Sequence, residues 1–267
     1  MKKSIKAITF LFITILVLSL VIAILSIDHV IDNKATTAHF FYNNCKKIWS
    51  HRGYTQNTDQ NSIEAMQAAI DLSAPGLEID VFFDKDHNEF IVSHDYPYNL
   101  KNGEILKLET VLQKFGNSIY YWLDFKNLSQ MSKTEALEAL EGLTKLDKAY
   151  QLKTRTLLES KNTRNLSFFT QSNFPTSYWF THSPDASVFR FWIDTYKAKI
   201  KYLYGDFSAI SMDYRQYSTR LKNALGEIPI LLWTVNDSPL LSTYLNDRSV
   251  KIILTDEQFF DINKCSL

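Results

Sequence analysis

Short apolar runs alternate with longer amphipathic segments through most of the chain. The runs rich in β-branched and aromatic residues, which predict strands, cover residues 47–51, 76–83, 119–126, 155–160, 176–181, 209–214, 229–235 and 250–256. Segments with helical spacing of apolar residues lie between them, at 62–72, 133–146, 186–202, 214–225 and 238–246. Eight strands alternating with helices predict an α/β protein with the architecture of a TIM (β/α)8 barrel. An additional run at 89–94 follows a polar turn and predicts a hairpin arm on the second strand.

A doubly wound open sheet is the alternative architecture, but no glycine-rich phosphate loop follows any of the predicted strands. In a barrel, catalytic residues come from the carboxyl ends of several strands. The polar residues found at such ends are His51, Asp80, Asp124, Lys126, Glu159, Asp213 and Asn236. Asp59, Asn61 and Asp237 are predicted to cap helices at their amino ends.

The first segment of the chain differs from the rest. Residues 7–27 carry no charge and are long enough to cross a bilayer as a helix. Lysines at positions 2, 3 and 6 predict a cytoplasmic amino terminus, which leaves the remainder on the periplasmic or extracellular side. A cleaved signal peptide is the rival interpretation, with a weak cleavage site at 36–38. We therefore predict a single-pass membrane protein with a signal anchor at 1–27, a polar stalk at 28–44 and a barrel at 45–267.

The charge balance bears on the class of ligand, and the two cysteines bear on a possible disulfide. Lys+Arg and Asp+Glu both total 29, so the chain lacks the basic excess typical of proteins that bind nucleic acid. Cys45 and Cys265 lie at the two ends of the predicted barrel, where its first and last units are neighbours. An oxidising compartment would permit a disulfide between them, and two unrelated thiols are the alternative.

The end of the first predicted strand reads Ser50-His51-Arg52-Gly53. An imidazole beside a guanidinium suits acid–base chemistry next to a phosphate, which arginine grips through two hydrogen bonds. A capping or ion-paired group on a loop is the structural alternative.

The second strand carries Glu78 and Asp80 two residues apart, so both project from one face. Leu77, Ile79 and Val81 flank them and imply burial, where carboxylates need a partner or a metal. Mg²⁺ and Ca²⁺ prefer such oxygen ligands. A solvated edge strand is the alternative.

Two further strand ends carry similar chemistry. The run at 91–93 ends at His94, and the third predicted barrel strand ends with Asp124 and Lys126. Asp124 would complete a three-carboxylate cage and Lys126 would neutralise a phosphate oxygen. An internal ion pair between Asp124 and Lys126 is the simpler interpretation.

Taken in order, these motifs resemble the glycerophosphodiester phosphodiesterases, within the superfamily of phosphatidylinositol-specific phospholipase C-like barrels. The resemblance rests on His-Arg-Gly, Asn61-Ser62, Glu-x-Asp, His-Asp, acid-x-Lys, the strand Trp233-Thr234-Val235-Asn236 and the closing strand Ile253-Leu254-Thr255-Asp256. It spans residues 49–256, which is nearly the whole globular part.

The resemblance implies a metal-dependent phosphoric diester hydrolase. It implies that His51 and His94 serve as base and acid, and that one Mg²⁺ or Ca²⁺ ion is held by Glu78, Asp80 and Asp124. Arg52, Lys126 and Trp233 would bind the substrate phosphate. A glycerophosphodiester and water would give an alcohol and glycerol 3-phosphate, with water or the substrate's own hydroxyl as nucleophile. Phospholipase C- or D-like cleavage of lipid or lysolipid head groups, and an inactive barrel that only binds, remain alternatives.

Two positions depart from the family pattern. Gln60 replaces the usual glutamate of Pro-Glu-Asn-Thr, and Asp124 replaces the usual glutamate of Glu-x-Lys. The second change keeps a carboxylate but shortens its reach, so the preferred metal or its affinity is expected to differ.

Overall fold

The structure is a computed structural model that describes residues 2–33, 42, 45–101, 103–182 and 187–263. Its central element is a closed barrel of parallel strands. They are β1 (Ile48–His51), β2 (Gly76–Asp84), β6 (Tyr120–Phe125), β7 (Thr156–Ser160), β8 (Thr176–Trp179), β9 (Ala209–Asp213), β10 (Ile230–Trp233) and β11 (Val250–Thr255). Their order is β1-β11-β10-β9-β8-β7-β6-β2, and parallel pairing of β1 with β2 closes the barrel. The predicted TIM barrel is confirmed.

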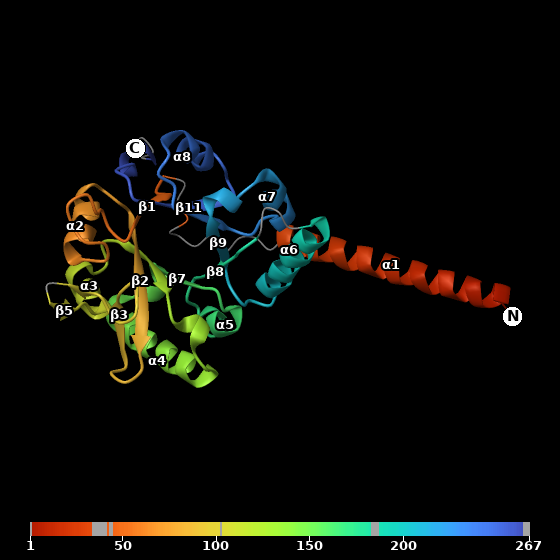
Figure 1. The fold of residues 1–267 in the computed structure, drawn as a ribbon, viewed down its shortest axis with the longest axis horizontal. Helices are drawn as coiled ribbons and strands as arrows, with labels where there is room; N and C mark the ends of the chain where they lie inside the picture. Colours follow the sequence, from red (N-terminus) through yellow and green to blue (C-terminus); the bar gives the residue numbers. More distant parts are fainter. Residues whose placement is uncertain (1, 34–41, 43–44, 102, 183–186, 264–267) are drawn as a thin grey trace.

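Helices surround the strands (Figure 1). They are α2 (Ile63–Asp71), α3 (Leu108–Phe115), α4 (Lys133–Tyr150), α5 (Thr163–Gln171), α6 (Val188–Leu203), α7 (Thr219–Leu225) and α8 (Ser238–Leu245). Single 3₁₀ turns occur at Leu128–Gln130, Leu152–Thr154, Tyr214–Gln216 and Phe260–Asn263.

Helix capping matches the sequence at one of the predicted positions. Asp237 accepts the backbone N–H of Leu240 and caps α8, as predicted. The prediction for Asp59 and Asn61 is wrong, because the cap of α2 is Ser62, which accepts the backbone N–H of Ala65. The side chain of Asn61 is directed instead to Asp80 on β2.

Two apolar layers hold the barrel together. The larger one lies between the strands and the surrounding helices. A smaller cluster contains Trp49, Trp122, Leu157, Ala209, Leu231, Ile252 and Leu254. Gly76 makes this packing possible, since a Cβ there would lie 2.2 Å from the Trp49 ring.

The connection from β2 to α3 contains extra structure. Strand β3 (Glu89–Val92) runs antiparallel to β2, which confirms the predicted hairpin arm. A small hairpin of β4 (Leu100–Lys101) and β5 (Glu104–Ile105) follows. His94 lies between these two hairpins, on the loop that leaves β3.

Helix α1 (Lys2–Asn33) projects away from the barrel beside α6 and α7 (Figure 1). From Ile8 to Asn33 it is long and apolar enough to cross a membrane. The helix continues past the predicted boundary at residue 27, and Ile31 packs into the core with 1% of its surface exposed. Asp28 pairs with Lys199 of α6 at 2.6 Å and accepts the Tyr196 hydroxyl at 2.9 Å. The first part of the predicted stalk is therefore a helix docked on the barrel.

Cys45, which precedes β1, is disulfide-bonded. Its predicted partner, Cys265, lies outside the described residues. The pairing stays a prediction.

Candidate active site

Three neighbouring strands bring the predicted site residues together. β2 pairs with β1 on one side and with β6 on the other, so that His51 is opposite Glu78 and Asp80 is opposite Asp124. Parallel strands of a barrel present their carboxyl ends at the same rim. The four side chains therefore meet at one end of the barrel.

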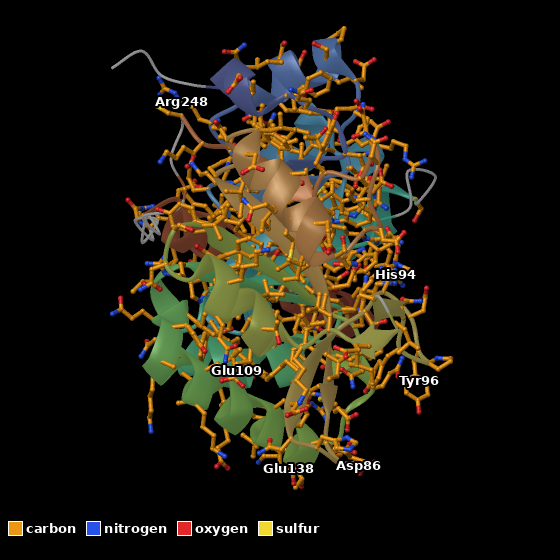
Figure 2. All side chains as sticks on the ribbon, turned by 90° about the vertical axis from the view of Figure 1, so that its left-hand side faces the viewer. Asp86, His94, Tyr96, Glu109, Glu138 and Arg248 are labelled. Atoms are coloured by element: carbon orange, nitrogen blue, oxygen red, sulfur yellow. The ribbon has the colours of Figure 1, made fainter. Side chains whose placement is uncertain are left out.

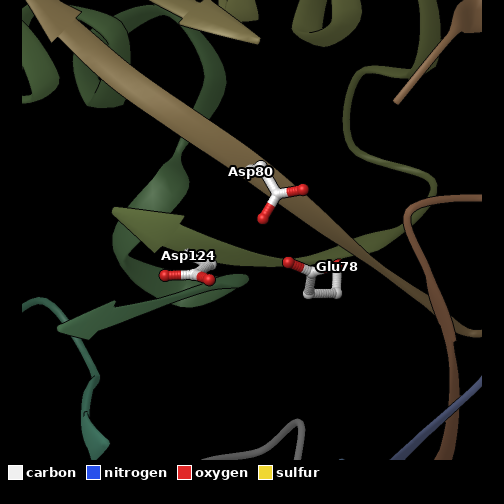
Figure 3. A group of neighbouring side chains, drawn as sticks. All are labelled: Glu78, Asp80 and Asp124. Carbon is white, nitrogen blue, oxygen red and sulfur yellow. The ribbon is translucent and has the colours of Figure 1, made fainter. Parts of the chain in front are cut away.

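The three acidic residues form a buried group. Glu78, Asp80 and Asp124 each place one carboxylate oxygen within 4.8 Å of the others (Figure 3). Burial raises the pKa of Glu78 well above its usual value, and the nearby Asp80 and Asp124 carboxylates raise it further. Burial also raises the pKa of Asp124, against the opposing effect of Lys126. Burial thus disfavours the charged form of Glu78 and Asp124, and a nearby cation stabilises them as carboxylates.

Two basic side chains lie against the acids. The Lys126 ammonium is 2.5 Å from both Asp80 and Asp124. Burial alone would lower the pKa of Lys126, but the two aspartates outweigh it and raise the pKa. Arg52 Nε lies 2.9 Å from Asp80 Oδ2. The ion pair between Asp124 and Lys126 and the carboxylate cluster are thus both present, although the sequence offered them as alternatives.

The backbone at Arg52 explains the His-Arg-Gly motif. Arg52 has a left-handed φ of 56°, and its backbone N–H donates to the carbonyl and the carboxylate of Glu78, both at 3.1 Å. Gly53 follows with φ 83°, and a Cβ there would lie 2.6 Å from the backbone of Ala65. The turn aims the guanidinium at Asp80 and also lets it donate to Gln60 at 2.9 Å. The neutral Gln60 therefore keeps a contact with Arg52.

His51 is held by a carboxylate at the end of the last strand. Its Nδ1 lies 2.7 Å from Asp256 Oδ1, and Asn236 donates to the other oxygen at 2.7 Å. Burial would raise the pKa of Asp256, but hydrogen bonds from His51 and Asn236 outweigh it and lower the pKa. The other ring nitrogen, Nε2, is 3.9 Å from Glu78 Oε2. His51 therefore presents Nε2 to the carboxylate cluster.

His94 approaches the carboxylate cluster from the loop that follows β3. Its Nδ1 lies 2.9 Å from Asp95 Oδ1, and its side chain is partly exposed. Figure 2 shows His94 on the right of the view. Because its ring lines a cavity with His51, Glu78 and Asp124, His94 lies at the carboxyl-end rim. Both histidines line one cavity with Arg52, Glu78, Asp124, Lys126, Glu159, Trp179, Trp233 and Leu254.

Two tryptophans form a wall of this cavity. Trp179 and Trp233 meet edge to face with ring centroids 5.0 Å apart. The buried indole N–H of Trp233 has no hydrogen-bond partner among the residues that the structure describes. A buried donor of this kind is costly unless a ligand accepts its hydrogen bond. The role of Trp233 in substrate binding stays a prediction.

Three residues near the site were not assigned a catalytic or binding role from the sequence. Asn61 donates to Asp80 at 2.6 Å and accepts its backbone N–H at 3.2 Å. Asp256 orients His51, and Glu159 of β7 is a further acid in the cavity wall, with a pKa raised mainly by burial and also by Asp124. The signal for Asp256 and Glu159 was their place at strand ends, and Asn61 and Asp256 also belong to motifs of the family resemblance.

No protein-family model matches the chain, and neither does any curated protein. The fold is shared with solved structures of glycerophosphodiester phosphodiesterases. One from Parabacteroides distasonis is 23% identical, with a TM-score of 0.60 over 81% of this chain and 94% of that one. One from Thermotoga maritima is 19% identical, with a TM-score of 0.57 over 80% and 95%.

A phosphodiesterase from Oleispira antarctica, solved with the product sn-glycerol-3-phosphate, shares the fold as well. It is 16% identical, with a TM-score of 0.57 over 81% of this chain and 96% of that one. At these identities the comparisons establish the fold.

Proposed function

We propose that the chain is a metal-dependent phosphodiesterase that hydrolyses glycerophosphodiesters to an alcohol and glycerol 3-phosphate. One observation carries the proposal. Two histidines, two cationic side chains and a buried carboxylate cluster converge at one cavity, at the barrel end where catalytic groups of this fold lie. The structural relatives named above support the choice of substrate, since one of them was solved with sn-glycerol-3-phosphate.

The carboxylate cluster fits a divalent cation. Its oxygens are the hard ligands that Mg²⁺ and Ca²⁺ prefer. The raised pKa values of Glu78 and Asp124 favour exchange of a proton for a metal. Glu78, Asp80 and Asp124 would hold the ion. When bound, it would supply Lewis-acid stabilisation of negative charge on the phosphate.

The basic residues and Trp233 would bind and orient the diester. Arg52 and Lys126 share Asp80 as a partner, so their charges are fixed in place before substrate arrives. Such preorganised charges stabilise a transition state without reorganising. The free indole N–H of Trp233 would donate to a substrate oxygen from the opposite wall.

The histidines would transfer protons. Asp256 holds Nδ1 of His51 and leaves Nε2 facing the cavity, which suits a general base that removes a proton from the nucleophile. His94, on the opposite loop, would return a proton to the leaving alkoxide. Water or a hydroxyl of the substrate's glycerol would serve as nucleophile.

The candidate membrane helix α1 supports a second candidate function, the cleavage of lipid head groups. The candidate span from Ile8 to Asn33 carries lysines before it, so we propose a single-pass anchor with the barrel on the periplasmic or extracellular side. Because its end is docked on α6, the barrel would be held close to the bilayer. Phospholipase C- or D-like cleavage of lipid or lysolipid head groups is therefore the second candidate.

Turnover of glycerophosphocholine by the full chain in detergent tests the proposal. Release of glycerol 3-phosphate should require Mg²⁺ or Ca²⁺ and stop with EDTA. His51→Ala and His94→Ala should lower kcat by about 10²–10⁴-fold, as expected for loss of a general acid or base. His87→Ala is the matched control, because His87 lies on the exposed β2–β3 turn. Absence of metal-dependent turnover of any phosphodiester would refute the proposal.

A further inference from the structure

Helix α6 carries an unusual set of exposed apolar side chains. Val188, Phe189, Trp192, Ile200 and Tyr204, which caps the helix, are all exposed, Phe189 to 75% and Tyr204 to 80%. Each of the other helices around the barrel has at most one exposed large apolar residue in the described chain. Contiguous exposed apolar surface of this kind marks an interaction site. We call these five residues the α6 apolar face.

Four members of the α6 apolar face line up along one side of the helix. Together with the half-buried Tyr196, they follow one another at intervals of three or four residues and so lie on one stripe: Phe189, Trp192, Tyr196, Ile200 and Tyr204. The rings of Trp192 and Tyr196 are 5.9 Å apart. The stripe is thus continuous from one end of α6 to the other.

The docked end of α1 meets this stripe in its middle. Tyr196 donates its hydroxyl to Asp28, and Lys199 forms an ion pair with the same carboxylate. Asp28 directly follows the uncharged segment 7–27, so no flexible linker separates the candidate membrane span from α6. Figure 1 shows α1 leaving the barrel on this side, away from α2 and α3. A bilayer crossed by α1 would therefore lie next to α6.

The composition of α6 suits a membrane surface. Tryptophan and tyrosine concentrate at the boundary between head groups and acyl chains. The exposed cations Arg190 and Lys197 accompany the aromatic residues, and Asp194 is the single acid of the helix. Basic amphipathic helices with aromatic residues on the apolar side lie in the plane of the interface, and anionic lipids attract them.

The amino end of α6 lies at the rim of the cavity. β8 ends at Trp179 in the cavity wall, and α6 is the next helix along the chain, so it begins at the same end of the barrel. The His182 ring, on the connection between them, packs 5.0 Å from Phe191 of α6. Contact of Val188 and Phe189 with lipid would bring the cavity opening to the level of the head groups.

We propose that the α6 apolar face is a second membrane contact, which lies in the bilayer interface beside α1 and lets the cavity take phosphodiester head groups from lipids of that bilayer. The inference rests on the proposed phosphodiesterase activity and on membrane insertion of α1. It identifies the substrate class as interfacial lipid phosphodiesters, with lysophosphatidylcholine as a suitable probe.

Tryptophan quenching tests the contact without reference to activity. The full chain is reconstituted into phosphatidylcholine vesicles that contain phosphatidylglycerol and brominated acyl chains. Trp49 and Trp122 are buried in the barrel, and Trp179 and Trp233 face the cavity, so quenching by bromine should come mainly from Trp192. Trp192→Phe should lose most of it. Equal quenching of the wild type and Trp192→Phe would overturn the proposal. The same result is expected if another protein or a second copy of the chain covers this face, because Trp192 would then not touch lipid.

Paired substrates test the consequence for turnover. The double variant Phe189→Ser/Trp192→Ser should lower hydrolysis of lysophosphatidylcholine in vesicles by about tenfold or more. It lacks two apolar side chains that the proposal places in the bilayer interface. Hydrolysis of soluble glycerophosphocholine should stay at the wild-type rate. Leu137→Ser with Leu240→Ser is the matched control, because these exposed residues lie on α4 and α8.

The outcomes separate the two proposals. Equal hydrolysis of the vesicle substrate by Phe189→Ser/Trp192→Ser and by the wild type would overturn the membrane contact. A wild type that hydrolyses neither substrate would refute the proposed activity, and the quenching experiment would still decide the contact.

Discussion

His51 depends on a residue 205 positions further along the chain. Asp256 follows β11, which pairs with β1 only because the barrel closes. The carboxylate fixes which ring nitrogen faces the cavity, and the lowered pKa of Asp256 keeps it ionised and able to do so. The same long-range contact would stabilise an imidazolium formed during proton transfer.

We predict that Asp256→Ala lowers kcat on glycerophosphocholine by about 10–100-fold, the usual effect of removing a group that orients a catalytic ligand. Metal affinity should not change, because Asp256 does not belong to the carboxylate cluster. Asp213→Ala is the control, since Asp213 also ends a strand but pairs with Arg215 away from the cavity wall. Kinetics and calorimetry on both variants measure the effects, and equal kcat for the two variants would contradict this role of Asp256.

At the scale of single residues, the sequence identified the catalytic and metal-binding candidates better than it identified the side chains that contact them. His51, Glu78 and Asp124 were recognisable because each ends or lies in an apolar run. Asn61 was taken for a helix cap because asparagine often has that role, but its amide is paired with Asp80. The partners of Asn61 and His51 come from other strands, so local sequence does not contain them.

At the scale of elements, each of the eight predicted strands overlaps a strand of the barrel. Apolar residues predominate in β2, β6, β10 and β11, and most of them are buried, which makes these strands visible in sequence. Helices α3 and α5 were not identified, and α5 is rich in Thr, Asn, Ser and Gln, which weaken a helical pattern. Its stability comes from packing, with Leu166 and Phe169 buried.

The junction of α1 and α6 rests on Asp28, and its removal should loosen this contact. We predict that Asp28→Ala lowers the stability of the detergent-solubilised chain by about 1–3 kcal/mol, because the buried Lys199 ammonium loses its carboxylate. Adding Lys199→Met should recover much of the loss, since the stranded charge is then gone. Thermal unfolding measures both effects.

Asp32→Ala is the control for this junction, because Asp32 is an exposed acid on the same helix. If Asp28→Ala unfolds at the same temperature as Asp32→Ala and the wild type, α1 is not fastened to the barrel through this pair.

At the scale of the whole molecule, helix α1 and the barrel are joined by packed and ion-paired side chains. The barrel fold and the apolar amino-terminal segment were both predictable, since each leaves a long pattern in the sequence. The docking of α1 on α6 was not, because it depends on Asp28, Ile31 and Lys199 meeting across the fold. This docking fixes the end of the candidate membrane span against the barrel.

Calorimetric titration of Mg²⁺ and Ca²⁺ into the metal-free chain tests most directly whether the carboxylates hold a metal while the histidines transfer protons. His51→Ala should bind the ion as the wild type does, although its turnover is lost. Glu78→Ala and Asp124→Asn should each bind at least about tenfold more weakly, because each removes an oxygen ligand. Unchanged metal affinity in both carboxylate variants would contradict the account.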